Sequence, residues 1–165
     1  MSTRAQQLVI LGGTGFVGSH LVPLLAHEER RILVLSRNRE RLRHLAVLPG
    51  VTARSADVYA PAVRAGHFAG ADAVVQLVGI LNEKGHDGAG FRRAHVELPR
   101  TVIGAMQQAG VKRLLHMSSL KAGQGSSHYL LTRGEGEALV KASGLEWTIF
   151  QPSVIFGTGD GLFNR

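Results

Sequence analysis

Short apolar runs alternate with amphipathic stretches along this chain. The runs at residues 8–11, 31–36, 51–54, 73–77, 113–117 and 147–150 are rich in leucine and β-branched residues, and each has the length of a buried parallel strand. Helical periodicity occupies residues 16–27, 39–47, 61–68, 91–109 and 127–143. Strands that alternate with helices predict βαβ units, so we expect an α/β fold of the Rossmann type. This is a three-layer αβα arrangement around a doubly wound parallel sheet.

Two prolines lie inside expected helices, Pro23 in the first and Pro99 in the fourth. Each removes a backbone donor and should kink its helix unless it lies in the first turn. The apolar periodicity continues on both sides of each proline, so we retain both helices. Gly110 and Gly144 follow the last two helices, at positions typical of a left-handed cap.

Composition narrows the class of protein. The chain has 165 residues, 44% hydrophobic and 19% charged, which is typical of one domain with a packed core. The absence of cysteine excludes disulfides, thiolate metal sites and a cysteine nucleophile, and it fits a reducing compartment. No apolar stretch approaches the ~18–20 residues of a membrane span, so we expect a soluble, cytoplasmic protein.

The charge balance is basic, with a formal net charge of +7 and several arginines between residues 30 and 43. Such a cluster can bind nucleic acid, but aromatic residues are only 5% and no nucleic-acid motif is present. We interpret it as a solvated face and expect no nucleic-acid partner. The eight histidines show no metal-ligand spacing, so no metal site is expected. His116, in an expected core strand, is interpreted as a buried histidine with its hydrogen bonds satisfied.

The strongest motif is Gly12-Gly13-Thr14-Gly15-Phe16-Val17-Gly18, between the first strand and the first helix. Glycines at this spacing allow a tight turn, close approach of a pyrophosphate and close packing of helix on strand. The N-terminus of the helix adds free N–H groups for the phosphates. A nucleotide triphosphatase loop is disfavoured because Ser19 stands where its lysine is required. A βα turn without a ligand is the alternative, and the βαβ context favours a dinucleotide.

The end of the second strand bears on the choice of cofactor. A carboxylate there would bind the ribose hydroxyls of NAD, but no acid occurs before Glu40. Arg37 could instead pair with a 2′-phosphate, which favours NADP(H) over NAD(H). The alternative is that Arg37 belongs to the solvated basic loop. Asp57, after the third strand, could reach the adenine amino group or cap the following turn.

The ordered set of motifs resembles the short-chain dehydrogenase/reductase superfamily. More narrowly, it is similar to the extended or atypical NAD(P)-dependent epimerase/dehydratase-like proteins, and to the group of the nucleotide-binding accessory subunit of respiratory complex I. The resemblance rests on residues 12–18, 56–58, 76–79, 95–110, 116–119, 129–137, 144–153 and 156–157.

The resemblance implies a role for each matching position. The pyrophosphate would be held by Gly12, Thr14, Gly15, Phe16, Val17 and Gly18. Further cofactor contacts are implied at Asp57 and Val58, at Leu77, Val78 and Gly79 beside the adenosine ribose, and at Pro152, Ser153, Val154 and Ile155 beside the nicotinamide.

The catalytic pair of this family is Tyr-x-x-x-Lys, and here it reads Tyr129-Leu130-Leu131-Thr132-Arg133. The resemblance makes Tyr129 the acid/base, with Arg133 in the place of the lysine and Ser118 or Ser119 as the hydroxyl that orients the substrate. Arginine keeps the charge of lysine but not its shape. Two hypotheses follow: an oxidoreductase or epimerase-like enzyme that transfers hydride, or a cofactor-binding module with a structural, assembly or sensing role.

Members of this group usually continue past the equivalent of Gly157 with a smaller portion that contacts the substrate. We therefore expect residues 1–165 to form the NAD(P)-binding Rossmann domain without most of that portion, and to expose an apolar patch where it docks. The substrate is expected to be a small molecule that the sequence does not identify. Superfamily members often dimerise through helices, so the resemblance allows a homodimer.

Overall fold

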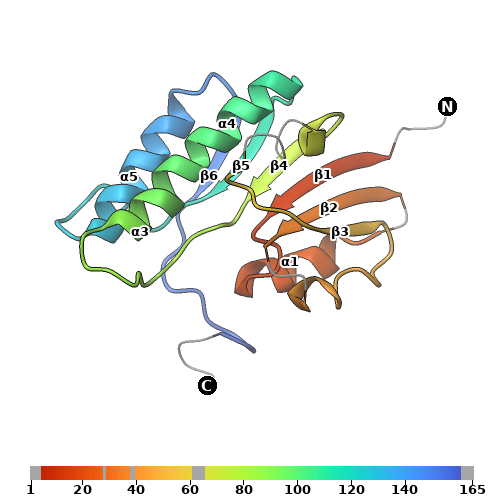
Figure 1. Cartoon of the computed structure of the whole chain (residues 1–165), viewed down its shortest axis with the longest axis horizontal. Coiled ribbons are helices and arrows are strands. Elements are labelled where there is room, and N and C mark those ends of the chain that lie inside the picture. Colours follow the sequence, from red (N-terminus) through yellow and green to blue (C-terminus); the bar gives the residue numbers. More distant parts are fainter. Residues whose placement is uncertain (1–4, 28, 38–39, 61–65, 161–165) are drawn as a thin grey trace.

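A six-stranded parallel sheet forms the centre of the protein, seen in a computed structural model that describes residues 5–27, 29–37, 40–60 and 66–160 (Figure 1). The strand order is β3-β2-β1-β4-β5-β6, and all five pairings are parallel. The strands are β1 (Gln6–Leu11), β2 (Arg30–Ser36), β3 (Val51–Ser55), β4 (Ala73–Gln76), β5 (Arg113–Met117) and β6 (Glu146–Phe150). The predicted Rossmann-type α/β fold is confirmed.

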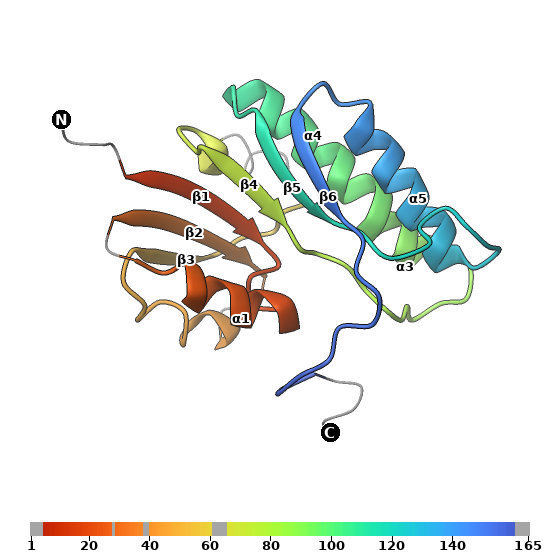
Figure 2. The same ribbon diagram turned by 180° about the vertical axis from the view of Figure 1, so that it is seen from behind.

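Helices cover the two faces of the sheet over different strands. Helix α1 (Phe16–Leu25) lies on one face, over β1 to β3 (Figure 2). The other face carries α3 (Ala89–Arg92), the π-helical turn η2 (Arg93–Glu97), α4 (Leu98–Ala109) and α5 (His128–Lys141). In the part of the chain described, no helix has both the length and the apolar character to cross a membrane.

Strand β1 is buried on both faces, which explains its continuous apolar sequence. Leu8 and Ile10 pack with Val22 of α1, whereas Val9 and Leu11 belong to the core under α4 and α5. The two cores are therefore separated by the sheet itself, and each is completed by helices on its own side.

The helix expected at residues 39–47 is a wrong prediction. Residues 40–42 form a single 3-10 turn, η1 (Glu40–Leu42), followed by further turns. The N–H groups of Arg43 and Leu45 bond to carbonyls three residues earlier, and Leu42 and Leu45 are the side chains buried against the core. Two anchors three residues apart suit 3-10 geometry and do not supply the apolar stripe that a longer α-helix needs. Of the helix expected at residues 61–68, residues 61–65 lie outside the described residues and 66–68 are helical.

Both prolines lie in helices, as expected, but at different positions in the helix. Pro23 lies inside α1, on its exposed side. Pro99 is in the first turn of α4, directly after the π-turn η2. Pro99 has no N–H to donate to the carbonyl of His95, four residues earlier, so the wider turn falls where the α-helical bond cannot form.

Gly136 of α5 provides a test of how closely the helices pack. A Cβ atom added at Gly136 would collide with the backbone carbonyl of His95, whereas one added at Gly104 of α4 would meet open space. We expect Gly136→Ala to destabilise the fold by about 1–3 kcal/mol, because backbone cannot move aside as a flexible side chain would. Gly104→Ala is the matched control and should stabilise it by about 0.5–1 kcal/mol. Urea unfolding measures both, and equal effects at the two positions would refute the close packing.

Candidate functional site

The glycine loop brings the carboxyl ends of β1 and β4 together. Gly12 follows β1 and has a φ of +81°, in the left-handed region that glycine adopts without strain. A Cβ atom at Gly12 would lie 2.9 Å from the backbone nitrogen of Val78 and 3.0 Å from the carbonyl carbon of Leu77. The first glycine of the motif is therefore required both by its φ and by the approach of the segment after β4.

Gly15 and Gly18 hold the start of α1 against the loop. Gly15 is the N-cap of α1, and its N–H donates to the carbonyl oxygen of Gly12 at 3.0 Å. A Cβ atom at Gly18 would collide with the backbone of Gly12 and Gly13. Gly18 thus lets the helix start close to the strand end, as the motif predicts.

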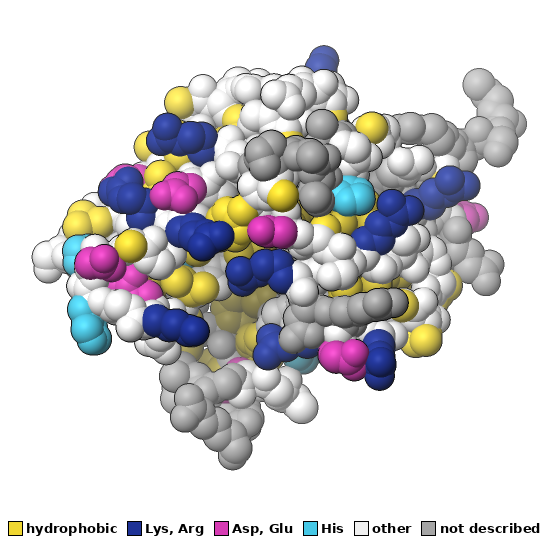
Figure 3. All heavy atoms as spheres, in the orientation of Figure 1, with side chains coloured by type: hydrophobic (Ala, Val, Ile, Leu, Met, Phe, Trp, Pro, Cys, Tyr) yellow, Lys and Arg dark blue, Asp and Glu magenta, His cyan; other side chains and the backbone are white. Residues whose placement is uncertain are grey.

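The residues present fit the pyrophosphate of a dinucleotide. The first turn of α1 contains no acidic residue, so no carboxylate opposes the partial positive charge of the helix N-terminus. The Thr14 and Ser36 hydroxyls lie 3.0 Å apart and connect the loop to the end of β2. Figure 3 shows a hollow with hydrophobic side chains at its floor and Lys or Arg side chains around it.

Three of the predicted cofactor contacts, Arg37, Asp57 and Val58, lie after the ends of β2 and β3. Arg37 directly follows β2 and is exposed. Asp57 is also exposed, and its Oδ1 accepts a hydrogen bond of 3.0 Å from the N–H of Tyr59, so the carboxylate caps the turn after β3. The Val58 side chain is buried in the core, which leaves its backbone as the part that can face a cofactor.

Tyr129 and Arg133 lie on α5 against the ends of β4 and β5. The Arg133 side chain is buried, and its Nη1 donates to the carbonyl oxygen of Met117 at 2.9 Å. Its guanidinium lies against Gly79, where a side chain would displace it, and its Cζ is 5.4 Å from the centre of the Tyr129 ring. The structure therefore brings Arg133, Tyr129 and Gly79 together.

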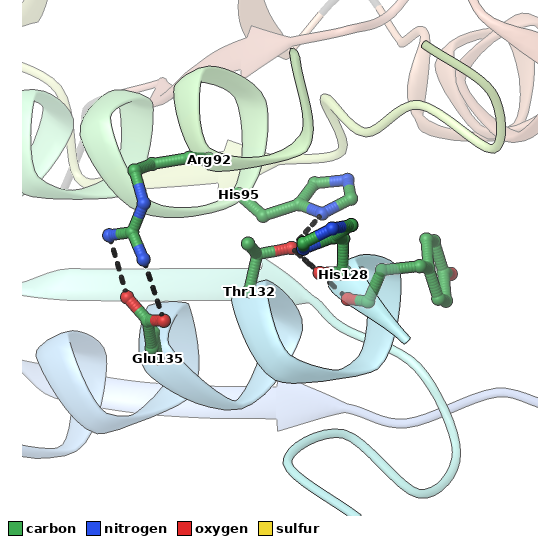
Figure 4. Close-up of polar contacts among 6 residues, drawn as sticks. Arg92, His95, His128, Thr132 and Glu135 are labelled. Atoms are coloured by element: carbon green, nitrogen blue, oxygen red, sulfur yellow. Dashed lines mark hydrogen bonds and ion pairs between the residues drawn. The ribbon is translucent and has the colours of Figure 1, made fainter. Parts of the chain in front are cut away.

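Two side chains that the sequence analysis did not single out hold Tyr129 from the other side. The rings of Phe91 and His95 contact the Tyr129 ring edge-on, with centroids 5.8 Å and 5.4 Å away. His95 accepts a hydrogen bond at Nε2 from the N–H of Ile80 (3.3 Å), so its proton is on Nδ1 and points to the Thr132 hydroxyl at 3.0 Å. That hydroxyl donates to the carbonyl of His128 at 2.7 Å (Figure 4).

An ion pair adds a second link between the same helices. Arg92 and Glu135 form two hydrogen bonds, of 2.8 and 2.9 Å, and Figure 4 shows them one helical turn from the His95 contact. Burial, and secondly the charge of Arg133, lower the pKa of His95 to about 3. His95 is therefore neutral at physiological pH and acts as a fixed hydrogen-bonding link.

His116 of β5 is buried as expected, but the expectation that its hydrogen bonds are satisfied is wrong. Its Nδ1 has no hydrogen-bond partner among the described residues. Burial, followed by the charge of Arg133, lowers the pKa of His116 to about 4. The imidazole can remain in the core because it stays neutral.

Ser118 and Ser119 follow β5, and both side chains are buried. Beside Ser118 lies Glu137 of α5, a buried carboxylate that the sequence analysis did not select. Burial alone would raise the pKa of Glu137, but Ser118, Gln151 and Lys141 together lower it. The i, i+4 spacing of Tyr129, Arg133 and Glu137 was the signal that could have identified it.

The predicted nicotinamide segment leaves the sheet after β6. The carbonyl of Pro152 accepts a hydrogen bond of 2.8 Å from the N–H of Leu120, so the segment begins beside the one that follows β5. Ser153, Val154 and Ile155 are exposed.

In the described part of the chain, no group of three or more His, Asp or Glu side chains could hold a metal ion.

Comparison with known proteins identifies the class to which this geometry belongs. The sequence profile of the NAD(P)H-binding family matches residues 12–161, and the chain belongs to that family. That match confirms the nicotinamide dinucleotide-binding domain that the resemblance implied.

Two curated relatives match nearly all of this chain. The ceramide reductase of Caulobacter vibrioides is 32% identical over 169 residues, which cover 99% of this chain and 52% of the relative. Subunit 9 of the mitochondrial NADH dehydrogenase [ubiquinone] 1 alpha subcomplex of Mus musculus is 30% identical, over 94% of this chain and 42% of the relative. The chain thus spans about half the length of these relatives.

Solved structures share the fold. A putative NAD-dependent epimerase/dehydratase from Bacillus halodurans superposes with a TM-score of 0.76 at 23% identity, over 93% of this chain and 74% of that one. UDP-glucuronic acid 4-epimerase from Bacillus cereus, in complex with NAD, gives a TM-score of 0.78 at 16% identity, over 92% and 57% of the two chains.

The buried histidines predict how stability depends on pH. The folded-state pKa of His116, about 4, lies below the ordinary 6.5, so the unfolded chain binds more protons between these values. The contribution of His116 is complete above about pH 6.5 and is lost as pH falls towards 4. Between pH 7 and pH 5 we expect a loss on the order of 1–2 kcal/mol from His116, and a similar one from His95.

Urea unfolding at pH 7 and pH 5 measures this loss. His116→Gln should show a smaller difference between the two pH values than the wild type. His86→Gln, at an exposed position, is the control and should match the wild type. An unchanged pH difference in His116→Gln would contradict the assignment.

Proposed function

We propose that the chain binds NADP(H) through the glycine loop and serves a reductase or epimerase-like reaction in which Tyr129 is the acid/base. The nicotinamide cofactor, when bound, supplies hydride transfer. The observation that carries the proposal is the position of Arg133, whose guanidinium is fixed between Gly79 and Met117 and lies over the Tyr129 ring. Arg133 therefore places the acid/base pair next to the segments that follow β4 and β5, where the cofactor is proposed to bind.

Tyr129 would exchange a proton with the hydroxyl or carbonyl oxygen of the substrate. Phe91 and His95 make T-shaped contacts with the Tyr129 ring, so the phenol can keep one orientation. Arg133 would offer N–H groups toward the space above Gly79. Ser118 or Ser119 would orient the reacting oxygen.

The preference for NADP(H) over NAD(H) is supported by the end of β2. Arg37 follows this strand directly and is exposed, and the sequence has no acid there before Glu40. A guanidinium can bind a 2′-phosphate, whereas the ribose of NAD is usually held by a carboxylate at this place.

A second candidate function is a cofactor-binding module without turnover. Arginine in place of the usual lysine supports it, as does the similarity to a subunit named as part of NADH dehydrogenase.

A small-molecule substrate, a homodimer and a cytoplasmic location remain predictions from the sequence. Val154, Ile155 and Phe156 are exposed at 60%, 41% and 71%.

Calorimetric titration with NADPH and with NADH tests the choice of cofactor. We expect NADPH to bind at least tenfold more tightly, and Arg37→Ala to remove that preference while it leaves NADH binding unchanged, because the arginine contacts only the added phosphate. Arg41→Ala, on the same basic stretch, is the control and should keep the preference. Tighter binding of NADH by the wild type would refute the assignment of Arg37.

Turnover distinguishes the two candidate functions. With NADPH and a panel of ketones and quinones as probes, we expect Tyr129→Phe to lower kcat about 10²–10⁴-fold and to leave the Kd for NADPH within twofold, because only the proton donor is removed. Leu131→Ala, at an exposed position of the same helix, is the control. Tight NADPH binding by the wild type with no oxidation of NADPH by any probe would favour the module without turnover.

A further inference from the structure

Glu137 connects α5 to the chain that leaves β6. Its Oε1 accepts a hydrogen bond of 2.7 Å from Nε2 of Gln151, and its Oε2 accepts one of 3.0 Å from Nζ of Lys141. The Glu137 side chain is only 5% exposed, whereas that of Lys141 is 53% exposed. Both carboxylate oxygens are thus used, one by Gln151 after β6 and one by Lys141 on α5.

Gln151 occupies the junction between strand and segment. It follows the last residue of β6, Phe150, and precedes Pro152. Backbone hydrogen bonds hold both neighbours: Ser118 N–H donates to the Phe150 carbonyl, and Leu120 N–H donates to the Pro152 carbonyl, each at 2.8 Å. The Gln151 side chain is therefore presented to α5 by a fixed backbone.

Holding α5 and the segment after β6 together with a buried carboxylate costs free energy. Taking its charge out of water costs several kcal/mol unless partners compensate it, and apolar side chains of similar size would pack at lower cost. What the carboxylate adds is direction, because it accepts from Gln151 along one line and fixes the start of the segment in register with α5. The same helix carries Tyr129 and Arg133 two turns and one turn earlier.

We propose that Glu137 is a positioning residue for the nicotinamide half of the cofactor. Through Gln151 it sets the path of residues 152–155 relative to Tyr129 and Arg133, so that the nicotinamide wall and the acid/base keep a fixed position relative to each other. The proposal rests on the proposed function, because it takes residues 152–155 as that wall.

Two ligands that differ only in the nicotinamide test the proposal. Calorimetry compares NADPH with 2′-phospho-ADP-ribose, which lacks the nicotinamide, and NADH with ADP-ribose as a second pair. Gln151→Leu and Glu137→Met should each weaken NADPH binding about tenfold and leave binding of 2′-phospho-ADP-ribose within twofold. The double variant should lose no more than either single one, because both remove the same link.

Lys141→Met is the matched control. It removes the other hydrogen bond to Glu137 but does not touch Gln151, so both ligands should bind as to the wild type. An equal loss for both ligands in Gln151→Leu would show a general structural role, and no loss for NADPH would show no role; either result overturns the proposal. Gln151 is exposed, so its replacement does not threaten folding.

Hydrogen exchange of the free protein gives a readout without any cofactor. Gln151→Leu and Glu137→Met should accelerate exchange at residues 153–158 at least tenfold, whereas Lys141→Met should not. Unchanged exchange in both variants overturns the positioning role, even where cofactor binds. If the wild type binds none of the four ligands but the segment loosens as described, the proposed function fails and the link from Glu137 to the segment stands.

Discussion

The carboxyl ends of β1 and β4 lie so close together at Gly12 that no side chain fits between them. This contact sets the geometry of the site, because the chain leaves β1 towards one face of the sheet and leaves β4 towards the other. Open α/β sheets bind ligands in the crevice formed where the chain direction divides in this way. The loop glycines, the end of β2 and the segment after β4 meet at this division of the chain. Their spacing depends on the absence of a Cβ at Gly12.

Beyond the crevice, the side chains under α5 are unusually polar for a protein core. Arg133, Glu137, His95 and His116 are each less than a tenth exposed. Burial of such groups is costly unless they are neutral or paired. The histidines are neutral because their pKa values are low, Glu137 has Gln151 and Lys141, and Arg133 donates to Met117. This arrangement gives up some stability and holds α5 in one orientation relative to the strand ends.

Much of this could be predicted from the sequence. Apolar runs located all six strands to within two residues at each end, because strands buried on both faces leave a continuous signal. Glycine spacing located the loop because the whole motif lies within residues 12–18. The turns at residues 40–48 were mistaken for a helix, because a pattern of apolar residues does not reveal that only Leu42 and Leu45 would be buried. His95 and Gln151 were not identified as part of the site, because their partners lie 14 or more residues away along the chain. Glu137 was missed although its i, i+4 spacing from Arg133 was a local signal.

The central claim is that the crevice at Gly12 is the dinucleotide site, and mapping of backbone amide NMR shifts on addition of NADPH tests it most directly. The account predicts the largest shifts at the amides of Gly12, Gly15 and Gly18 and at residues 77–79. Two pockets that share Arg54 and His67 form a separate concave region beside β3. Shifts confined to that region, or no shifts at saturating NADPH and NADH, would contradict the account.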